Sequence, residues 1–280
     1  MSELTVVHTG VDFGEGPRWH DGRLWFSDFF RGGVYSLGDD GERLEVAIDD
    51  RPSGLGWLPD GTLLVVAMLS RKVLAVGADG TIRVHADLSE IATERCNDMV
   101  VSADGHAYVG NFGFDLDARE SFQPARLAHV TPDGEARAVE HALAFPNGSV
   151  ITPDGSTLLV GETFAGRYTA FDLADDGTPV EPRVWAAFEN LTPDGCCLDA
   201  EGAIWVADFV GRRFARVHED GSISREIPTD EHAVACMLGG DDGTTLFGFV
   251  SPGSHPDAVA GKGLTTIVAA ATDVPRAGLP

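Results

Sequence analysis

The sequence has little positive charge and no long hydrophobic run. Only 20 of its 280 residues are lysine or arginine, against 44 aspartates and glutamates, which gives a formal net charge of −24. Such a field repels nucleic-acid phosphates and anionic lipids, so we expect neither a nucleic acid nor a membrane as a partner. The longest apolar run, TLLVVAML at 62–69, is too short to cross a bilayer. The opening MSELTVVHTG lacks a basic and an apolar segment, so we expect no signal peptide and a cytoplasmic protein.

Cysteine is also scarce. The four cysteines are Cys96, Cys196, Cys197 and Cys236; two are adjacent, and none has the C-x-x-C spacing of a zinc site. This argues against a disulfide framework and against structural zinc. No histidine or basic residue accompanies them at fixed spacing, so we interpret them as small buried hydrophobes and not as nucleophiles. The sequence also has no phosphate-binding loop and no G-x-S-x-G elbow.

What the chain does contain is a repeat. Asp-Gly or Glu-Gly stands between two apolar segments six times, with successive spacings of 39, 44, 50, 47 and 41 residues. An Asp-Gly pair between apolar runs is the strongest local signal for a β-hairpin. The six pairs begin at Asp21, Asp60, Asp104, Asp154, Glu201 and Asp242.

Five of the six units carry a second Asp-Gly pair, so each unit is interpreted as four short antiparallel strands. Units of about 40–50 residues with four strands are typical of β-propeller blades. The sixth unit is one strand short, and LTVVHT near the N-terminus can supply that strand and close the ring. We therefore predict an all-β protein, a six-bladed β-propeller, with residues 1–280 as a single domain.

Counting back from each first turn predicts which side chains meet at the channel mouth. Asn97, Asn147 and Asp194 stand seven residues before their turns, and Glu15 stands six before Asp21. The equivalents in the second and sixth blades are Ser53 and Ala235. Four of six blades thus place an oxygen-bearing side chain at one level.

Two carboxylates and two amides suit a hard divalent cation. Calcium prefers six to eight oxygen ligands in a flexible shell, and the absence of His and Cys from the ring argues against copper or zinc on chemical grounds. We expect one divalent ion, with calcium first and magnesium, manganese or zinc as alternatives.

Four motifs carry a resemblance to a known family. GEGPRW, RCNDM, FPNGSVITPDGSTLLVGET and PDGCCLDAEGAIWVADFVGRRFARV occur in this order, and together they resemble the regucalcin/gluconolactonase-like propellers. The resemblance implies one divalent cation and hydrolysis of lactones, with organophosphate hydrolysis in some members. It implies Glu15, Asn147 and Asp194 as metal ligands, with Asn97 bound directly or through water or substrate. It also implies a substrate contact for Arg95 and a base role for Asp194.

The expected reaction is opening of a small lactone or ester by water. Asp194 is the first base, with Asp98 as the alternative, and Arg95, Asn97 and His232 are expected to contact substrate. Two interpretations compete with a lactonase. One is an organophosphate (phosphotriester) hydrolase that uses the same metal site, and the other is a non-enzymatic calcium-binding propeller. The third-blade segment 113–127 and the sixth-blade segment 230–240 are both expected to lie over the mouth. The sequence leaves open a monomer or a small homo-oligomer.

Overall fold

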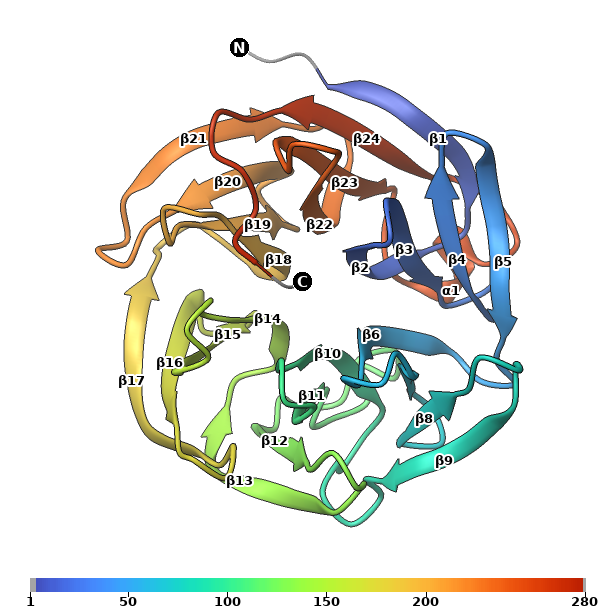
Figure 1. Cartoon of the computed structure of the whole chain (residues 1–280). Coiled ribbons are helices and arrows are strands. Elements are labelled where there is room, and N and C mark those ends of the chain that lie inside the picture. The colour runs from blue at the N-terminus through green and yellow to red at the C-terminus, as the bar shows by residue number, and fades with distance from the viewer. Residues whose placement is uncertain (1–3, 279–280) are drawn as a thin grey trace.

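The computed structural model describes residues 4–278, which form six four-stranded antiparallel sheets around a central axis (Figure 1). The predicted six-bladed β-propeller is confirmed. The first three blades, from the channel outward, are β2 (Gly14–His20), β3 (Arg23–Asp28), β4 (Gly33–Gly38) and β5 (Gly41–Ala47); β6 (Pro52–Trp57), β7 (Leu63–Ala67), β8 (Lys72–Val76) and β9 (Ile82–Asp87); and β10 (Cys96–Val101), β11 (Ala107–Asn111), β12 (Ala125–Val130) and β13 (Ala136–Leu143).

The remaining blades follow the same order, and the last is completed by the N-terminal strand. They are β14 (Pro146–Ile151), β15 (Thr157–Glu162), β16 (Arg167–Leu173) and β17 (Pro179–Ala187); β18 (Pro193–Leu198), β19 (Ile204–Asp208), β20 (Arg213–Val217) and β21 (Ile223–Pro228); and β22 (His232–Gly239), β23 (Thr245–Ser251), β24 (Thr265–Ala271) and β1 (Thr5–Val11).

Closure of the ring follows the prediction. Strand β1 pairs antiparallel with β24, placing Thr5 opposite Ala269 and Val11 opposite Thr265. The first and last parts of the chain thus share one sheet, so no inner strand is left without a neighbouring blade. The turns also form as the Asp-Gly pairs predict: Gly61, for example, has φ +84°, a backbone conformation that glycine adopts at little cost.

The inner strands are buried over most of their length and pack closely against one another. Every residue of β10 is buried, and apolar clusters fill the space between adjacent blades. Close approach depends on small residues here. A Cβ on Gly54 would lie 2.2 Å from the Met99 amide nitrogen, so only glycine lets β6 and β10 approach this closely.

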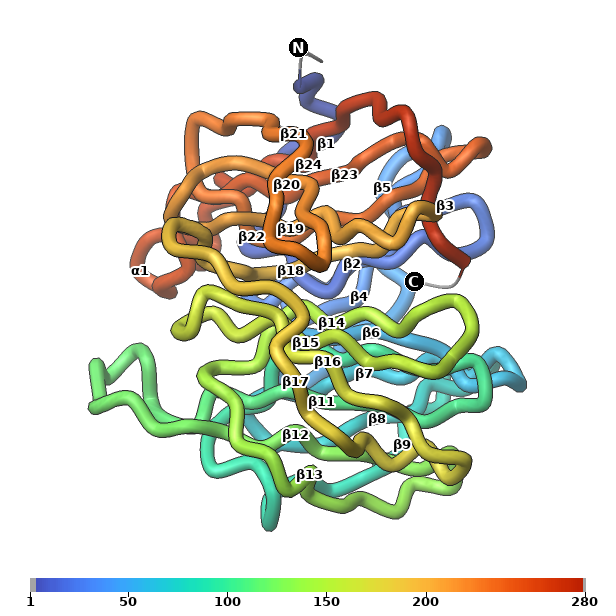
Figure 2. Tube along the Cα trace, turned by 90° about the vertical axis from the view of Figure 1, so that its left-hand side faces the viewer, coloured from blue at the N-terminus to red at the C-terminus, as the bar shows by residue number. Residues whose placement is uncertain are grey.

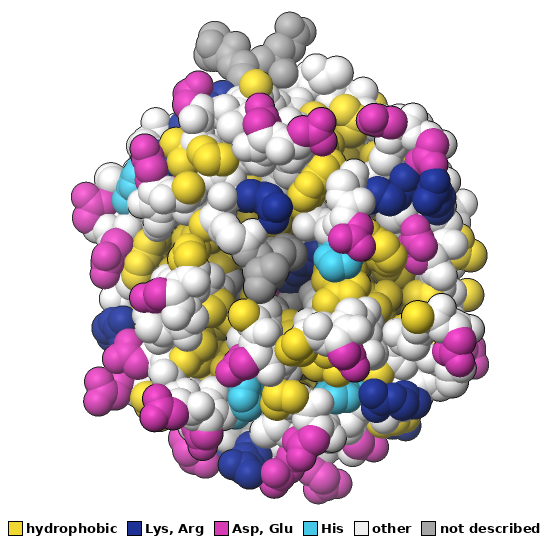
Figure 3. All heavy atoms as spheres, in the orientation of Figure 1, with side chains coloured by type: hydrophobic (Ala, Val, Ile, Leu, Met, Phe, Trp, Pro, Cys, Tyr) yellow, Lys and Arg dark blue, Asp and Glu magenta, His cyan; other side chains and the backbone are white. Residues whose placement is uncertain are grey.

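The two faces of the disc differ. Figure 2 shows that the segment between β11 and β12 and the short helix α1 (Pro256–Val259) project from one face, while the C-terminal end lies at the other. Figure 3 shows that other face, where acidic side chains are spread around the rim, as expected from the net charge. No helix within 4–278 has the length and apolar character needed to span a lipid bilayer.

Candidate functional site

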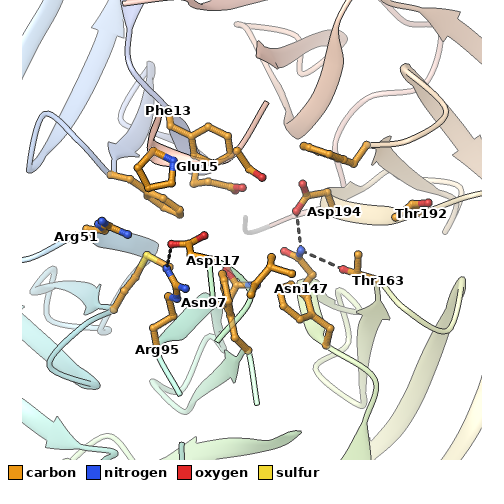
Figure 4. A pocket seen from close by; sticks show the side chains of 18 of the residues that line it. Phe13, Glu15, Arg51, Arg95, Asn97, Asp117, Asn147, Thr163, Thr192 and Asp194 are labelled. Atoms are coloured by element: carbon orange, nitrogen blue, oxygen red, sulfur yellow. Dashed lines mark hydrogen bonds and ion pairs between the residues drawn. The ribbon is translucent and has the colours of Figure 1, made fainter. Parts of the chain in front are cut away.

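A cavity of about 370 Å³ opens where the inner strands begin. Its lining includes all four oxygen-bearing residues predicted from the register: Glu15, Asn97, Asn147 and Asp194. Figure 4 shows their side chains converging from four separate blades. We call these four, with Ser53 and Ala235 from the other two blades, the floor ring.

The floor ring is built by one local feature repeated around the axis. Each of the four oxygen-bearing residues is the second residue of its strand. In each of these strands the pairing register also shifts at or just after that position, as between Glu15 and Arg18 in β2 and between Pro193 and Cys196 in β18. A bulge of this kind bends a strand and re-aims a side chain, and here it aims the floor residues at the axis.

Hydrogen bonds fix which atoms of the floor ring face the cavity. The Asn97 amide nitrogen donates to the Pro146 carbonyl at 3.3 Å. The Asn147 amide nitrogen donates to an Asp194 carboxylate oxygen at 2.6 Å and to the Thr163 hydroxyl at 3.2 Å. Both amide nitrogens are therefore occupied, and neither amide oxygen accepts a hydrogen bond from any described residue.

The two floor carboxylates lie in an electrostatically unfavourable place. Both are buried. Burial, followed by the negative charge of Asp194 and Asp98, raises the pKa of Glu15. Burial also raises the pKa of Asp194, against the opposing effect of the hydrogen bond from Asn147. Two buried carboxylates facing one cavity need a compensating positive charge if both are to stay ionised.

The arginine on the same strand as Glu15 does not supply that charge to the cavity. Arg18 donates to a carboxylate oxygen of Asp98 at 3.2 Å and to the Met99 carbonyl. Asp98 also accepts from the Met99 amide at 2.8 Å. Neither Arg18 nor Asp98 is among the residues that line the cavity. The base role for Asp98 stays a prediction, and its ion pair places the carboxylate beside the cavity and not in its wall.

Arg95 lines the cavity, but its charge is paired. Its guanidinium donates to Asp117 at 2.7 Å and to Asp115 at 3.0 Å, and it lies over the Phe112 ring at 4.9 Å. Both aspartates belong to the segment between β11 and β12. Arg95 thus ties that segment to the mouth of the cavity, and its substrate contact stays a prediction.

His232 is placed behind the cavity wall. Its Nδ1 lies 2.8 Å from the Phe209 carbonyl oxygen, and its ring stacks on the Phe209 ring at 4.3 Å between centroids. Phe209 lines the cavity and His232 does not. The sixth-blade segment differs from its expectation too: residues 232–239 form inner strand β22 instead of covering the mouth. From the last blade, Ser254 and Pro256 reach the cavity.

Two further rings of residues form the walls above the floor ring, and of their members only Arg95 was predicted from the sequence. We call the six residues that stand two positions before the floor residues the inner wall. Five of the six line the cavity: Phe13, Arg51, Arg95, Phe145 and Thr192. These residues stand just before the inner strands begin and line the cavity above the floor ring. The same count that found the floor ring would have found them.

The outer wall consists of the residues that directly follow the second strand of each blade. Its cavity-lining members are Phe29, Met68, Phe112, Thr163 and Phe209. In each of the five blades the outer-wall amide donates to the inner-wall carbonyl, as Phe29 does to Phe13 at 3.1 Å and Phe209 to Thr192 at 3.2 Å. The walls are therefore held by backbone bonds that do not depend on which side chains they carry.

Buried acidic residues at the ends of the second strands also support the walls. Asp28 accepts from the amides of Asp12 and Phe13, and Asp208 accepts from the amide of Thr192 at 3.0 Å. These carboxylates hold the backbone that leads into the inner strands. Their sequence signal was present, because Asp28 and Asp208 each stand seven residues after the first turn of their blade.

The four cysteines are free and buried. Burial raises the pKa of Cys96 to about 12, so this thiol stays protonated at neutral pH. Within residues 4–278, no three His, Cys, Asp or Glu side chains form a cluster suited to a metal ion. The floor ring contains two carboxylates, and its other oxygens belong to asparagine.

Fold and site together define a six-bladed propeller with an oxygen-lined pocket at one mouth of its channel. Residues 13–249 match the SMP-30/gluconolactonase/LRE-like region, and the chain belongs to this family. Pentonolactonase XacC of Haloferax volcanii is 28% identical over 272 residues, covering 94% of this chain and 89% of that protein. Regucalcin of Danio rerio is 25% identical over 214 residues, covering 74% and 68%.

Solved structures share the fold. A luciferin-regenerating enzyme superposes with a TM-score of 0.84 at 19% identity, covering 100% of this chain and 99% of the other. A calcium-binding protein, regucalcin from Agrobacterium tumefaciens, superposes with a TM-score of 0.79 at 22% identity, covering 99% and 98%.

Proposed function

We propose that this chain is a divalent-cation-dependent hydrolase that opens lactones. The observation that carries the proposal is the floor ring, where two buried carboxylates and two asparagine oxygens face one cavity. Family membership supports it, because relatives include a named pentonolactonase and a structural neighbour described as calcium-binding.

The floor ring fits a hard cation. The asparagine nitrogens are used within the protein, so the amide groups offer oxygens to the cavity. Glu15 and Asp194 add negative charge, and neither forms an ion pair with the cavity-lining Arg51 or Arg95. Oxygen donors of this kind suit calcium, and magnesium or manganese as well. A cation held by Glu15, Asn147 and Asp194, with Asn97 beside it, would polarise an ester carbonyl and acidify bound water.

In this proposal Asp194 transfers the proton. Asn147 donates to one of its carboxylate oxygens, which fixes the carboxylate and leaves the other oxygen toward the cavity. That oxygen accepts a proton as a water oxygen bonds to the lactone carbonyl carbon. The ring C–O bond then breaks, and the ring oxygen takes up the proton to give a hydroxy acid. We assign this role to Asp194 over Asp98, whose carboxylate is paired with Arg18.

Substitution of the floor ring tests the proposal. We expect Glu15→Ala, Asn147→Ala and Asp194→Ala each to lower kcat/KM for a lactone by more than about 100-fold, since loss of mere supporting groups around a metal already costs about 10–100-fold. Metal content should fall in parallel, while the circular dichroism spectrum stays that of a β-protein.

Ser53→Ala provides the matched control. Ser53 is a buried member of the same ring but is not a proposed ligand, so this variant should keep both metal and activity. Unimpaired hydrolysis by any of the three folded, metal-replete ring variants would overturn the ligand set. If the protein hydrolyses phosphotriesters and no lactone, the proposed lactonase would be rejected in favour of a phosphotriesterase.

A further inference from the structure

We propose that the pocket selects lactones whose ring carries an aromatic or alkyl group, and rejects polyhydroxylated ones. This substrate class rests on the proposed lactone hydrolysis but is argued from different residues. The floor ring defines the chemistry, whereas the inner and outer walls define what is bound above it.

The walls are predominantly aromatic. Seven phenylalanines line the cavity. In the first blade, Phe13 lies against Phe29 at 5.1 Å and against Phe30 at 6.5 Å between ring centroids. In Figure 4, Phe13 stands across the cavity from Asn147. This blade therefore contributes a continuous apolar surface on its side of the cavity.

A second aromatic surface comes from the third and fourth blades. Phe145 packs against Phe112 at 4.5 Å and against Phe164 at 5.0 Å between centroids. Phe145 also has φ +65°, a left-handed conformation that a bulky side chain adopts only where its surroundings enforce it. The fold therefore places this ring in the wall despite a backbone cost.

Two polar side chains of the walls, Arg95 and Thr163, are already bonded within the protein, and the Arg51 guanidinium lies over the Phe30 ring at 5.0 Å from its centroid. Arg95 is paired with Asp115 and Asp117. The Thr163 hydroxyl donates to the Pro193 carbonyl at 2.7 Å and accepts from Asn147. A polyhydroxylated lactone would set several hydroxyls against phenyl rings without partners, which is unfavourable for binding.

The cavity is large enough for a substituted ring. Its volume of about 370 Å³ lies within the range of small-molecule sites, about 300–1,000 Å³. The floor carries the carboxylates and amides and the walls carry the phenylalanines, so the ester group is directed to the floor ring and the hydrocarbon part to the phenyl rings. Phe164, 51% exposed, and Val210, 68% exposed, extend this apolar surface to the mouth.

Three six-membered lactones that differ in what the ring carries test the inference. They are dihydrocoumarin, fused to a benzene ring; unsubstituted δ-valerolactone; and glucono-1,5-lactone, which carries hydroxyls. Because dihydrocoumarin is a phenyl ester and is intrinsically more reactive than an alkyl lactone, each kcat/KM is divided by the rate constant for opening of the same lactone by hydroxide before the three are compared. We expect the normalised kcat/KM for dihydrocoumarin to exceed that for gluconolactone by at least about 100-fold, with valerolactone between them. Preference for gluconolactone would overturn the inference while leaving lactone hydrolysis established.

A binding measurement separates this inference from the proposed reaction. The lactam analogue of dihydrocoumarin lacks the reactive ester, and its affinity can be measured by calorimetry on the metal-loaded protein. We expect it to bind at least about 100-fold more tightly than gluconolactam. Binding of the aryl lactam without hydrolysis of any lactone would support the pocket and reject the proposed function. Equal or absent binding of both lactams would overturn the substrate class.

Two exposed phenylalanines offer a matched pair of variants. Phe164 lines the cavity, whereas Phe122, 47% exposed, packs on Phe164 at 6.0 Å but lies outside the lining. We expect Phe164→Gln to lower the dihydrocoumarin-to-valerolactone ratio of kcat/KM about tenfold, and Phe122→Gln to change it by less than twofold. Equal effects of the two substitutions would contradict a direct substrate contact at the wall.

Discussion

At the residue scale, the site depends on a position that carries no functional group. Gly148 follows the floor residue Asn147, and a Cβ there would lie 2.5 Å from the Asp194 carbonyl oxygen and 2.7 Å from the Cys196 amide nitrogen. Adjacent inner strands β14 and β18 can approach only because this side chain is absent. Glycine at this position therefore sets the distance between Asn147 and Asp194.

We expect Gly148→Ala to separate these strands and to lower the free energy of unfolding by about 1–3 kcal/mol, the usual cost of overpacking a core. Metal affinity should fall with it, because the Asn147–Asp194 hydrogen bond spans the same two strands. Thermal unfolding and calorimetric titration would measure both effects. Gly253→Ala is the control, since its nearest neighbour would lie 3.6 Å away. Unchanged stability in Gly148→Ala would contradict the packing argument.

The residue scale also shows what the sequence could predict. Constant spacing from the turns located Glu15, Asn97, Asn147 and Asp194, because inner strands of nearly equal length bring equivalent positions to one level. Arg51 precedes Ser53 as Arg95 precedes Asn97, so the inner wall was within reach of the same count. The pairing of Arg95 with Asp115 and Asp117 could not be predicted from the sequence, because it depends on the path of the irregular segment between β11 and β12.

At the element scale, the segment between β11 and β12 forms part of the cavity wall. Leu116 and Asp117 line the cavity, and Arg95 holds the segment through two carboxylates. Phe114 anchors its base, packing on Phe164 at 5.8 Å between centroids. The predicted position over the mouth agrees with this placement. Residues 230–240 were expected over the mouth, but residues 232–239 of this stretch form the inner strand β22.

Shortening this segment should change substrate selection more than metal binding. A two-glycine linker in place of residues 115–121 removes Leu116 and Asp117 from the cavity lining and keeps the contact between Phe114 and Phe122. We expect KM for dihydrocoumarin to rise several-fold because Leu116 leaves the wall, while the metal dissociation constant stays within about twofold. Steady-state kinetics and metal titration would test this. An unchanged substrate profile, or loss of metal alone, would contradict a wall role.

At the scale of the whole molecule, the ring provides what no single blade can. Each blade offers one floor residue, and closure of the ring through β1 and β24 brings four oxygen-bearing side chains to the axis. The net charge of −24 adds a field that attracts cations to the protein. Number of blades, closing strand and floor level could all be predicted from the repeat. The packing of the wall phenylalanines against one another could not, because these residues come from different blades and meet only in the folded ring.

We expect lactone hydrolysis by this protein to require a divalent cation at the floor ring. The most direct test is the rate of dihydrocoumarin opening, followed by a pH indicator, before chelation, after chelation and after stepwise return of calcium, magnesium or manganese. We expect activity to be lost on chelation and restored by close to one equivalent of one of these cations, with the β-sheet spectrum unchanged. Full activity in protein shown by elemental analysis to be free of metal would contradict the account.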